Sequence, residues 1–378
     1  MSGRAMKSRW FLVLIAAVAV GVFTATVPTF REFFDLGVYR GAVQHWLLTG
    51  QDLYAFRYQE SVYGFTYPPF AALVLSPLAL TSWPVAVTFS LIVNVFCVIL
   101  LLRWFLPPEL HRIRWLAALS FLAVLLFEPV RDTFSFGQVN LVLLVLVTAG
   151  LRHPRWAGAG IGLAAAIKLT PAVFIGYLLL TRQYRSAAIA VGTAAGATVL
   201  AALIAPQASR VFWTEALWDT GRVGKLEYVS NQSLRGVVAR LDVSSVWWLV
   251  AVLIVVACWA WWLRGNGAAD PAAAVALTGM VACLISPVTW VHHLVWLLPA
   301  FLLILQRELG HRRRLAGLAA LYVVFCSSFV WLWWAHPLGW GAFLGSNLYV
   351  WATLVLAVAL VTPSLRARAG QPRERSFG

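Results

Sequence analysis

Polar clusters interrupt an otherwise apolar chain, and the first of them contains a carboxylate suited to acid–base chemistry. Asp35 and Tyr39 are four residues apart, so a helix would place both side chains on one face. Apolar residues recur at helical spacing between Arg31 and Thr49, which predicts an amphipathic helix along a membrane surface. Asp35 on such a helix could take a proton from a hydroxyl as a general base, or it could simply be solvated. The same loop ends in Tyr67-Pro68-Pro69.

Two further clusters place amides and cations beside apolar runs. Gln138 and Asn140 follow a segment that includes Arg131, and amides are costly to bury in lipid. They therefore predict either binding to a polar ligand or hydrogen bonds between helices. Lys168 lies between two short apolar runs, where a lysine needs an anionic partner, which could be a phosphate, Asp132 or Glu128. The alternative is that its amine extends to the membrane surface.

The last two clusters contain amides and imidazoles. Asn231 and Gln232 precede Ser233, a pattern that also fits an ordinary helix start or a glycosylation site, and Arg235 follows. His292 and His293 come directly after Trp290-Val291. Adjacent residues of a helix point about 100° apart, so the two histidines are poor ligands for one metal. Hydrogen bonding to an anion is an alternative, and a structural role is another.

The composition shows which elements must position these clusters. Of the 378 residues, 61% are hydrophobic and 11% are charged, which excludes soluble, disordered and fibrous proteins. We therefore expect an all-α polytopic membrane protein, a single domain over 1–378, with a short apolar helix at 70–81. Twelve apolar stretches predict twelve spans: 10–27, 84–106, 114–127, 139–151, 156–167, 169–181, 186–205, 245–263, 271–286, 294–305, 315–334 and 348–361.

The distribution of basic residues predicts the orientation. With the N-terminus inside, cytoplasmic segments contain 19 of the 29 Lys and Arg residues and four of the 14 acids. Both termini are then cytoplasmic, the first apolar run is a retained anchor rather than a cleaved signal peptide, and 364–378 is a disordered basic tail. The net charge of +15 is explained by this topology, so nucleic acid is not an expected partner. All five polar clusters fall on the outer side.

The order of these motifs resembles a known family. The motifs are Asp35…Tyr39, Gly50-x-x-Leu53-Tyr54, Tyr67-Pro68-Pro69, Gly137-Gln138-Val139-Asn140, Lys168-Leu169-Thr170-Pro171, Asn231-Gln232-Ser233 and Trp290-x-His292-His293. Over about residues 30–300 the chain resembles the actinobacterial polyprenol-phosphate-mannose-dependent α-mannosyltransferases of glycosyltransferase family 87. The resemblance implies a GT-C-like fold in the plasma membrane with an active site facing the outside.

The resemblance also implies roles for the clustered residues. Asp35 would deprotonate the acceptor hydroxyl, and mannose would pass with inversion from polyprenyl phosphate to a glycolipid or lipoglycan of the cell envelope. No cofactor and no metal are expected. The donor phosphate would be held by His292 or His293, Lys168, Arg131 and Arg235. The sugar or acceptor would be bound by Tyr39, Tyr67, Gln138, Asn140, Asn231, Gln232 and Trp290.

Other functions remain open at this point. A polyprenyl-phosphate-arabinofuranose donor is the main alternative, because relatives of the family that the chain resembles include arabinosyltransferases. A lipid or solute transporter would show symmetry between its halves and ionisable groups on both sides, whereas the polar clusters here are one-sided. A structural partner subunit is the remaining alternative.

Overall fold

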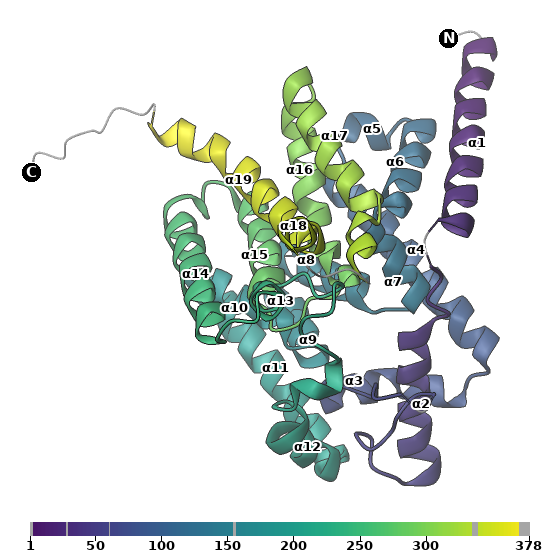
Figure 1. The fold of residues 1–378 in the computed structure, drawn as a ribbon, viewed down its shortest axis with the longest axis vertical. Helices are drawn as coiled ribbons and strands as arrows, with labels where there is room; N and C mark the ends of the chain where they lie inside the picture. Colours follow the sequence, from purple (N-terminus) through teal and green to yellow (C-terminus); the bar gives the residue numbers. More distant parts are fainter. Residues whose placement is uncertain (1–2, 28, 60, 154–155, 335–338, 370–378) are drawn as a thin grey trace, which may run out of the picture.

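The structure is a computed structural model that describes residues 3–27, 29–59, 61–153, 156–334 and 339–369. Across these residues it contains helices and no strand (Figure 1). The all-α prediction is therefore confirmed. Four helices are long and apolar enough to cross a membrane: α1 (Gly3–Thr26), α4 (Trp83–Phe105), α11 (Tyr184–Ile204) and α14 (Val246–Asn266).

Two further apolar segments are helices broken by a sharp bend. The axes of α7 (Glu128–Phe136) and α8 (Asn140–Arg152) differ by 115°, and α18 (Trp340–Ser346) meets α19 (Leu348–Ala369) at 60°. The shorter elements are α3 (Pro69–Leu75), η1 (Ser76–Leu80), α6 (Arg114–Leu126), α9 (Ala159–Ile167), η2 (Thr170–Ala172), α10 (Val173–Leu180), α15 (Pro271–Ile285), η5 (Val291–Leu297), α16 (Leu298–Glu308), α17 (Arg312–Cys326) and η6 (Phe329–Trp333).

Each of the twelve predicted apolar stretches contains helix, but most are too short to cross alone. Counting each bent pair as one span, six segments have the required length and apolarity within the described residues. The number of crossings and the side on which the termini lie stay predictions. In the predicted basic tail, α19 continues to Ala369, and 370–378 lies outside the described residues.

The predicted amphipathic helix is present as α2 (Phe34–Thr49), and the predicted short helix at 70–81 is present as α3 with η1. These elements pack together around a buried cluster that includes Val43 and Ala72. Side chains of α2 also donate to carbonyl groups within and just after η1: Arg40 Nη2 lies 2.6 Å from Thr81 O, and Gln44 Nε2 lies 3.1 Å from Ala79 O. These hydrogen bonds, together with the buried cluster, hold α2 against the rest of the molecule.

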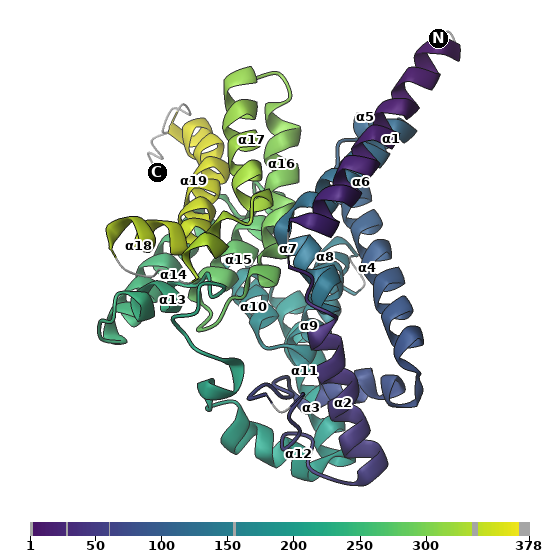
Figure 2. The same cartoon turned by 45° about the vertical axis from the view of Figure 1, so that its right-hand side comes forward.

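Small residues let α9 pack closely against α8 and α11. A Cβ atom at Gly160 would overlap the carbonyl oxygen of Leu146 in α8, and one at Gly162 would overlap that of Ala190 in α11. The larger core surrounds α15 and α16, and α1 lies at the edge of the molecule beside α6 (Figure 2). The remaining short elements are α5 (Pro108–His111), α12 (Pro206–Val211), η3 (Phe212–Ala216), η4 (Thr220–Val223) and α13 (Leu234–Arg240).

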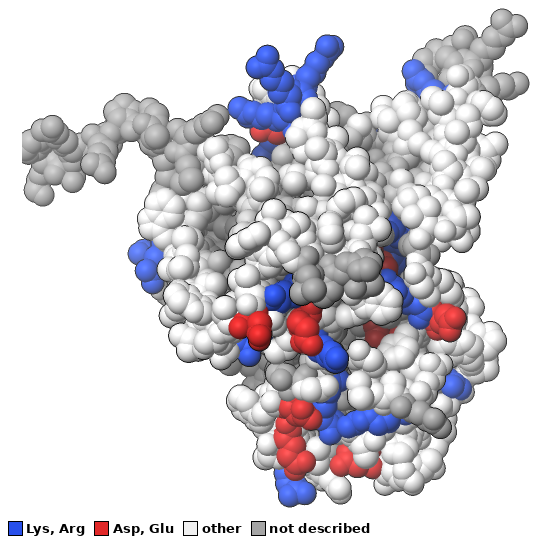
Figure 3. Space-filling model, viewed as in Figure 1, with Lys and Arg blue, Asp and Glu red and all other residues white. Residues whose placement is uncertain are grey.

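Charged side chains are unevenly distributed on the face shown in Figure 3. A group of Lys and Arg covers the turn between α16 and α17, where Arg314 pairs with Glu308. Most of the visible Asp and Glu lie in the lower half of this face, where they are intermixed with Lys and Arg. The distribution agrees with the direction of the charge bias in the sequence.

Candidate active site

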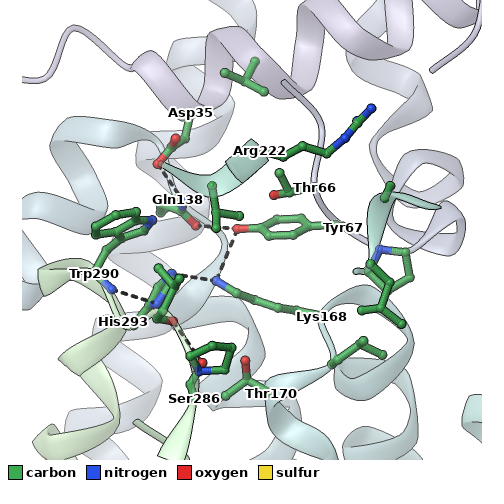
Figure 4. A pocket seen from close by; sticks show the side chains of 18 of the residues that line it. Asp35, Thr66, Tyr67, Gln138, Lys168, Thr170, Arg222, Ser286, Trp290 and His293 are labelled. Carbon is green, nitrogen blue, oxygen red and sulfur yellow. Dashed lines mark hydrogen bonds between the residues drawn. The ribbon is translucent and has the colours of Figure 1, made fainter. Parts of the chain in front are cut away.

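A cavity of about 520 Å³ lies where the ends of several helices meet. Residues of α2, of the segment before α3, of the break between α9 and η2, and of the chain between α15 and η5 line it (Figure 4). Its apolar wall includes Val173, Phe212 and Ile285. Its polar side contains Asp35, Tyr39, Tyr67, Gln138, Lys168, Trp290 and His293, all predicted from the sequence.

A tight turn brings Gln138 to Asp35. Gly137 ends α7 with φ +68°, a conformation that favours glycine, and a Cβ atom there would lie 2.6 Å from the Cβ of Leu36. The chain then bends into α8 with Gln138 facing α2. Gln138 Nε2 donates a hydrogen bond to Asp35 Oδ2 at 2.6 Å. The turn therefore couples the broken helix to the carboxylate.

The environment of Asp35 suits a general base. Burial raises the pKa of Asp35 from its usual value of 3.8 to about 6, while the hydrogen bond from Gln138 and the positive charge of Lys168 lower it. A carboxylate with this pKa is deprotonated at neutral pH and is more basic than an exposed one. The side chain lines the cavity, where a hydroxyl could reach it.

Lys168 is positioned by the end of α9. The helix stops at Ile167, and Lys168 adopts an extended backbone conformation before η2 begins at Thr170. This confirms the predicted break before Pro171. The amine of Lys168 donates to Asn140 Oδ1 at 3.0 Å and to the hydroxyl of Tyr67 at 3.3 Å.

His293 faces the amine of Lys168. Its Nε2 lies 2.9 Å from Lys168 Nζ, and its Nδ1 accepts a hydrogen bond from the backbone N–H of Trp290 at 3.1 Å. Because Nδ1 accepts, the neutral ring holds its proton on Nε2. Burial lowers the pKa of Lys168 to about 7. When Lys168 is protonated, its ammonium group and this N–H group point at each other, an arrangement that an anionic oxygen accepting from both would relieve.

The tyrosines connect the two sides of this polar network. The hydroxyls of Tyr39 and Tyr67 lie 2.9 Å apart, and Tyr67 donates to Gln138 Oε1 at 3.1 Å. Hydrogen bonds therefore join Lys168 through Tyr67 and Gln138 to Asp35 without interruption (Figure 4). The network places the carboxylate of Asp35 and the N–H groups of Lys168 and His293 in a single cavity.

Of the remaining predicted residues, His292 and Asn140 lie behind the cavity. His292 is buried, its ring packs against Phe136 with centroids 4.9 Å apart, and its Nε2 has no hydrogen-bond partner among the described residues. Asn140 is also buried and links the amine of Lys168 to the carbonyl oxygen of His292, to which its Nδ2 donates at 3.3 Å. Asn140 thus positions Lys168, and of the two histidines only His293 lines the cavity.

The structure does not bring the Asn231–Gln232 pair to the cavity. Asn231 Oδ1 accepts from the backbone N–H of Thr289 at 2.9 Å, and Gln232 Nε2 donates to Ser346 O at 2.7 Å. Both side chains are buried and connect the start of α13 to neighbouring segments. Since their polar atoms are already paired, their contacts are those of scaffold residues.

The two predicted arginines are also away from the cavity. Arg131 donates to Leu126 O at 2.8 Å and to Ser328 Oγ at 2.6 Å, joining α7 to the turn after α17. The guanidinium of Arg235 lies over the ring of Trp248, 5.2 Å from its centroid. Neither side chain lines the cavity.

The cavity also includes polar residues to which the sequence assigned no role, among them Thr66, Thr170 and Ser286. Arg222 lines it from the long segment between α11 and α13, where it donates to Tyr54 O at 2.9 Å and pairs with Asp219 at 3.3 Å. Arg222 belongs to none of the sequence motifs, and only the folded chain places it beside the loop that follows α2. In the part of the chain that the structure describes, no group of three or more His, Cys, Asp or Glu could hold a metal ion.

Comparison with known proteins gives this cavity a context. The family model for glycosyltransferase family 87 matches residues 65–287. The chain is 33% identical to the polyprenol-phosphate-mannose-dependent alpha-(1-2)-phosphatidylinositol mannoside mannosyltransferase of Mycobacterium tuberculosis, over 94% of this chain and 92% of the relative. It is 32% identical to a polyprenol-phosphate-mannose-dependent alpha-(1-2)-phosphatidylinositol pentamannoside mannosyltransferase of Mycolicibacterium smegmatis, over 95% and 90%.

Among solved structures, ArnT from Cupriavidus metallidurans bound to undecaprenyl phosphate is similar with a TM-score of 0.41 and 17% identity, over 95% of this chain and 78% of that one. A similarity at that level does not establish a shared fold. The sequence matches do establish the family. The chain belongs to glycosyltransferase family 87 and is a membrane glycosyltransferase of the hexosyltransferase type.

Proposed function

We propose that this chain transfers a mannosyl residue from a polyprenyl-phosphate donor to a glycolipid or lipoglycan acceptor on the outer side of the plasma membrane, with inversion. The observation on which the proposal depends is the joint placement of Asp35, Lys168 and His293 around one cavity. This combination supplies a base for the acceptor and N–H donors for a departing phosphate. The apolar cavity wall is compatible with a lipid-linked substrate.

In the proposed reaction, the oxygen of the acceptor hydroxyl attacks C1 of the donor sugar. The bond between C1 and the phosphate oxygen breaks, and its electron pair leaves with polyprenyl phosphate. The hydroxyl proton passes to Asp35, which lines the cavity as a carboxylate. Attack on the face opposite the phosphate inverts the anomeric configuration. The transfer is thus a single displacement without a covalent enzyme intermediate.

Lys168 and His293 are the residues proposed to donate hydrogen bonds to the phosphate of the sugar donor. Lys168 Nζ and His293 Nε2 lie 2.9 Å apart, so one phosphate oxygen can accept a hydrogen bond from each of them. Fixed donors aimed at developing negative charge lower the barrier without reorganisation. We propose that they do so without a metal or another cofactor. Tyr39, Tyr67 and Trp290 are the proposed contacts of the sugar or acceptor, because they line the same cavity.

The choice of sugar and lipid follows from the relatives. The curated relatives are named as polyprenol-phosphate-mannose-dependent mannosyltransferases that act on phosphatidylinositol mannosides. A mannose donor and a mannosylated phosphoinositide acceptor are therefore proposed here too. No feature of the cavity favours the arabinofuranose donor over mannose.

The test uses membranes that contain the protein, with radiolabelled polyprenyl-phosphate mannose or its arabinose analogue as donor. We expect transfer from mannose only, and an Asp35→Asn variant should lose about 100- to 10,000-fold in rate because the base is absent. Asp242→Asn is the matched control, since Asp242 is exposed and has φ +52°, which asparagine tolerates. An active Asp35→Asn variant would refute the base, and transfer from the arabinose donor would refute the sugar.

A further inference from the structure

Gln138 lines the cavity, yet both polar atoms of its amide are already used by the protein. We infer that Gln138 is a positioning residue that holds Asp35 by Oδ2 and so leaves Oδ1 to take the proton from the acceptor. The inference builds on the proposed function. It differs from the expectation that Gln138 binds the sugar.

The orientation of the amide is fixed by two donors. Gln138 Oε1 accepts from the hydroxyl of Tyr67 at 3.1 Å and from the backbone N–H of Val139 at 3.2 Å. A flipped amide would point its NH₂ group at the backbone N–H of Val139 and its oxygen at the carboxylate of Asp35, so the oxygen must occupy this side. The NH₂ group consequently faces Asp35, whose Oδ2 lies 2.6 Å from Nε2.

The hydroxyl of Tyr67 makes this orientation directional. It gives its only proton to Gln138, and its oxygen accepts from Lys168 Nζ at 3.3 Å and lies 2.9 Å from the hydroxyl of Tyr39. Every donor in the sequence Lys168, Tyr67, Gln138 therefore points toward the carboxylate. The phosphate-binding side of the cavity is therefore connected to the proposed base by three hydrogen bonds that all run in the same direction, from Lys168 toward Asp35.

The two oxygens of Asp35 are left in different states. Oδ2 accepts from Gln138, whereas Oδ1 accepts no hydrogen bond from any residue in the described part of the chain. A general base needs a free lone pair within reach of the hydroxyl. A hydrogen bond donated to the charged form also favours the carboxylate, and the bond from Gln138 is the largest effect opposing burial in setting the pKa of Asp35.

Other charged and titratable groups act on Asp35 from the surrounding elements. Lys168 lowers the pKa of Asp35 through its positive charge. Tyr39 of α2 and Tyr67 before α3 have pKa values raised by burial and stay neutral in the range where Asp35 titrates. Asp132 of α7 interacts with the charge of Asp35. Substitution of Gln138 removes none of these four groups, although Tyr67 loses the acceptor of its hydroxyl proton.

The experiment measures transfer by Gln138→Leu and Gln138→Glu variants as a function of pH, with the polyprenyl-phosphate mannose donor. For Gln138→Leu we expect kcat to fall about 10- to 100-fold while the donor KM stays within about threefold, because the side chain does not bind substrate. The acidic limb of the kcat/KM profile should move up by about one pH unit, because the hydrogen bond that stabilises the charged form of Asp35 is lost. Gln138→Glu should move it further through repulsion between two carboxylates.

Gln44→Leu is the matched control, because it removes a hydrogen bond of the same kind between α2 and Ala79 and lies outside the cavity. Its acidic limb should coincide with that of the parent protein. A donor KM raised tenfold or more in Gln138→Leu, with an unmoved limb, would assign Gln138 to the sugar and overturn the inference. If Gln138→Leu does not fold, an unmoved limb in the isosteric Gln138→Glu variant overturns it as well.

The inference and the proposed function fail in different ways. If Asp35→Asn stays active, the proposed base is wrong. If Asp35→Asn is inactive but neither Gln138 variant moves the acidic limb, the base stands and the positioning role of Gln138 is refuted.

Discussion

At the scale of single residues, Asp35 links structure to a measurable pH dependence. Burial raises its pKa to about 6, and the base is active only when deprotonated. Activity should therefore fall about tenfold per unit below that pH. Burial lowers the pKa of Lys168 to about 7, so activity should also decline above that value as the ammonium group loses its proton. Measuring kcat/KM between pH 4.5 and 8 checks this expectation. A rate that is unchanged down to pH 4.5 would contradict it.

Lys168 gives a second prediction at this scale. Lys168→Met keeps the aliphatic stem and removes the charge that faces His293, so phosphate binding and leaving-group stabilisation should both weaken. We expect kcat/KM for the donor to fall about 100- to 1,000-fold, as when a fixed donor to a developing charge is removed. Lys225→Met serves as the control because Lys225 is exposed. Equal kinetics in the two variants would remove Lys168 from the phosphate site.

The sequence predicted the residue types of the cavity better than their individual tasks. Asp35, Lys168 and His293 meet in space although they are far apart in the chain. Amides gave the least certain predictions, because Gln138 and Asn231 both interrupt apolar surroundings. The folded chain places the first in the cavity and pairs the second with the backbone of Thr289. The spacing of motifs along the sequence does not show which polar groups become neighbours in the folded chain.

At the scale of elements, the position of Lys168 depends on how closely α9 approaches its neighbours. Gly162→Ala should force α9 away from α11, because the new Cβ atom would overlap the carbonyl oxygen of Ala190. Overpacking of this kind costs about 1–3 kcal/mol, so the unfolding temperature in detergent should drop and transfer should weaken. Gly192→Ala on α11 is the control, since nothing lies within 4 Å of its added Cβ. Equal stability of the two variants would contradict the tight contact.

Several elements were predictable because their signals are local. The helix at 70–81 lies between Pro68-Pro69 and Pro84, and the break after Ile167 precedes Pro171. By contrast, α7 lies between the apolar stretches 114–127 and 139–151, and its 115° bend to α8 depends on contact between Gly137 and Leu36. That contact joins residues about 100 positions apart, so local patterns could not indicate it.

At the scale of the whole molecule, the proposal predicts which surface faces outward. A cysteine introduced at position 52, in a variant whose four native cysteines are replaced, should react with a membrane-impermeant maleimide added to intact cells. A cysteine at position 313, in the basic group at the start of α17, should react only after the membrane is permeabilised. Labelling in the reverse pattern would place the cavity on the cytoplasmic side.

The facing donors of Lys168 and His293 have a consequence for turnover. A polyprenyl-linked sugar phosphate has a single negative charge, whereas the spent carrier, with its terminal phosphate exposed, has up to two. Two cationic or N–H groups held 2.9 Å apart therefore retain the spent carrier more strongly than the incoming substrate. Under the proposed reaction, we therefore expect slow release of the used lipid, and we expect used lipid that accumulates in the surrounding bilayer to inhibit further glycosylation.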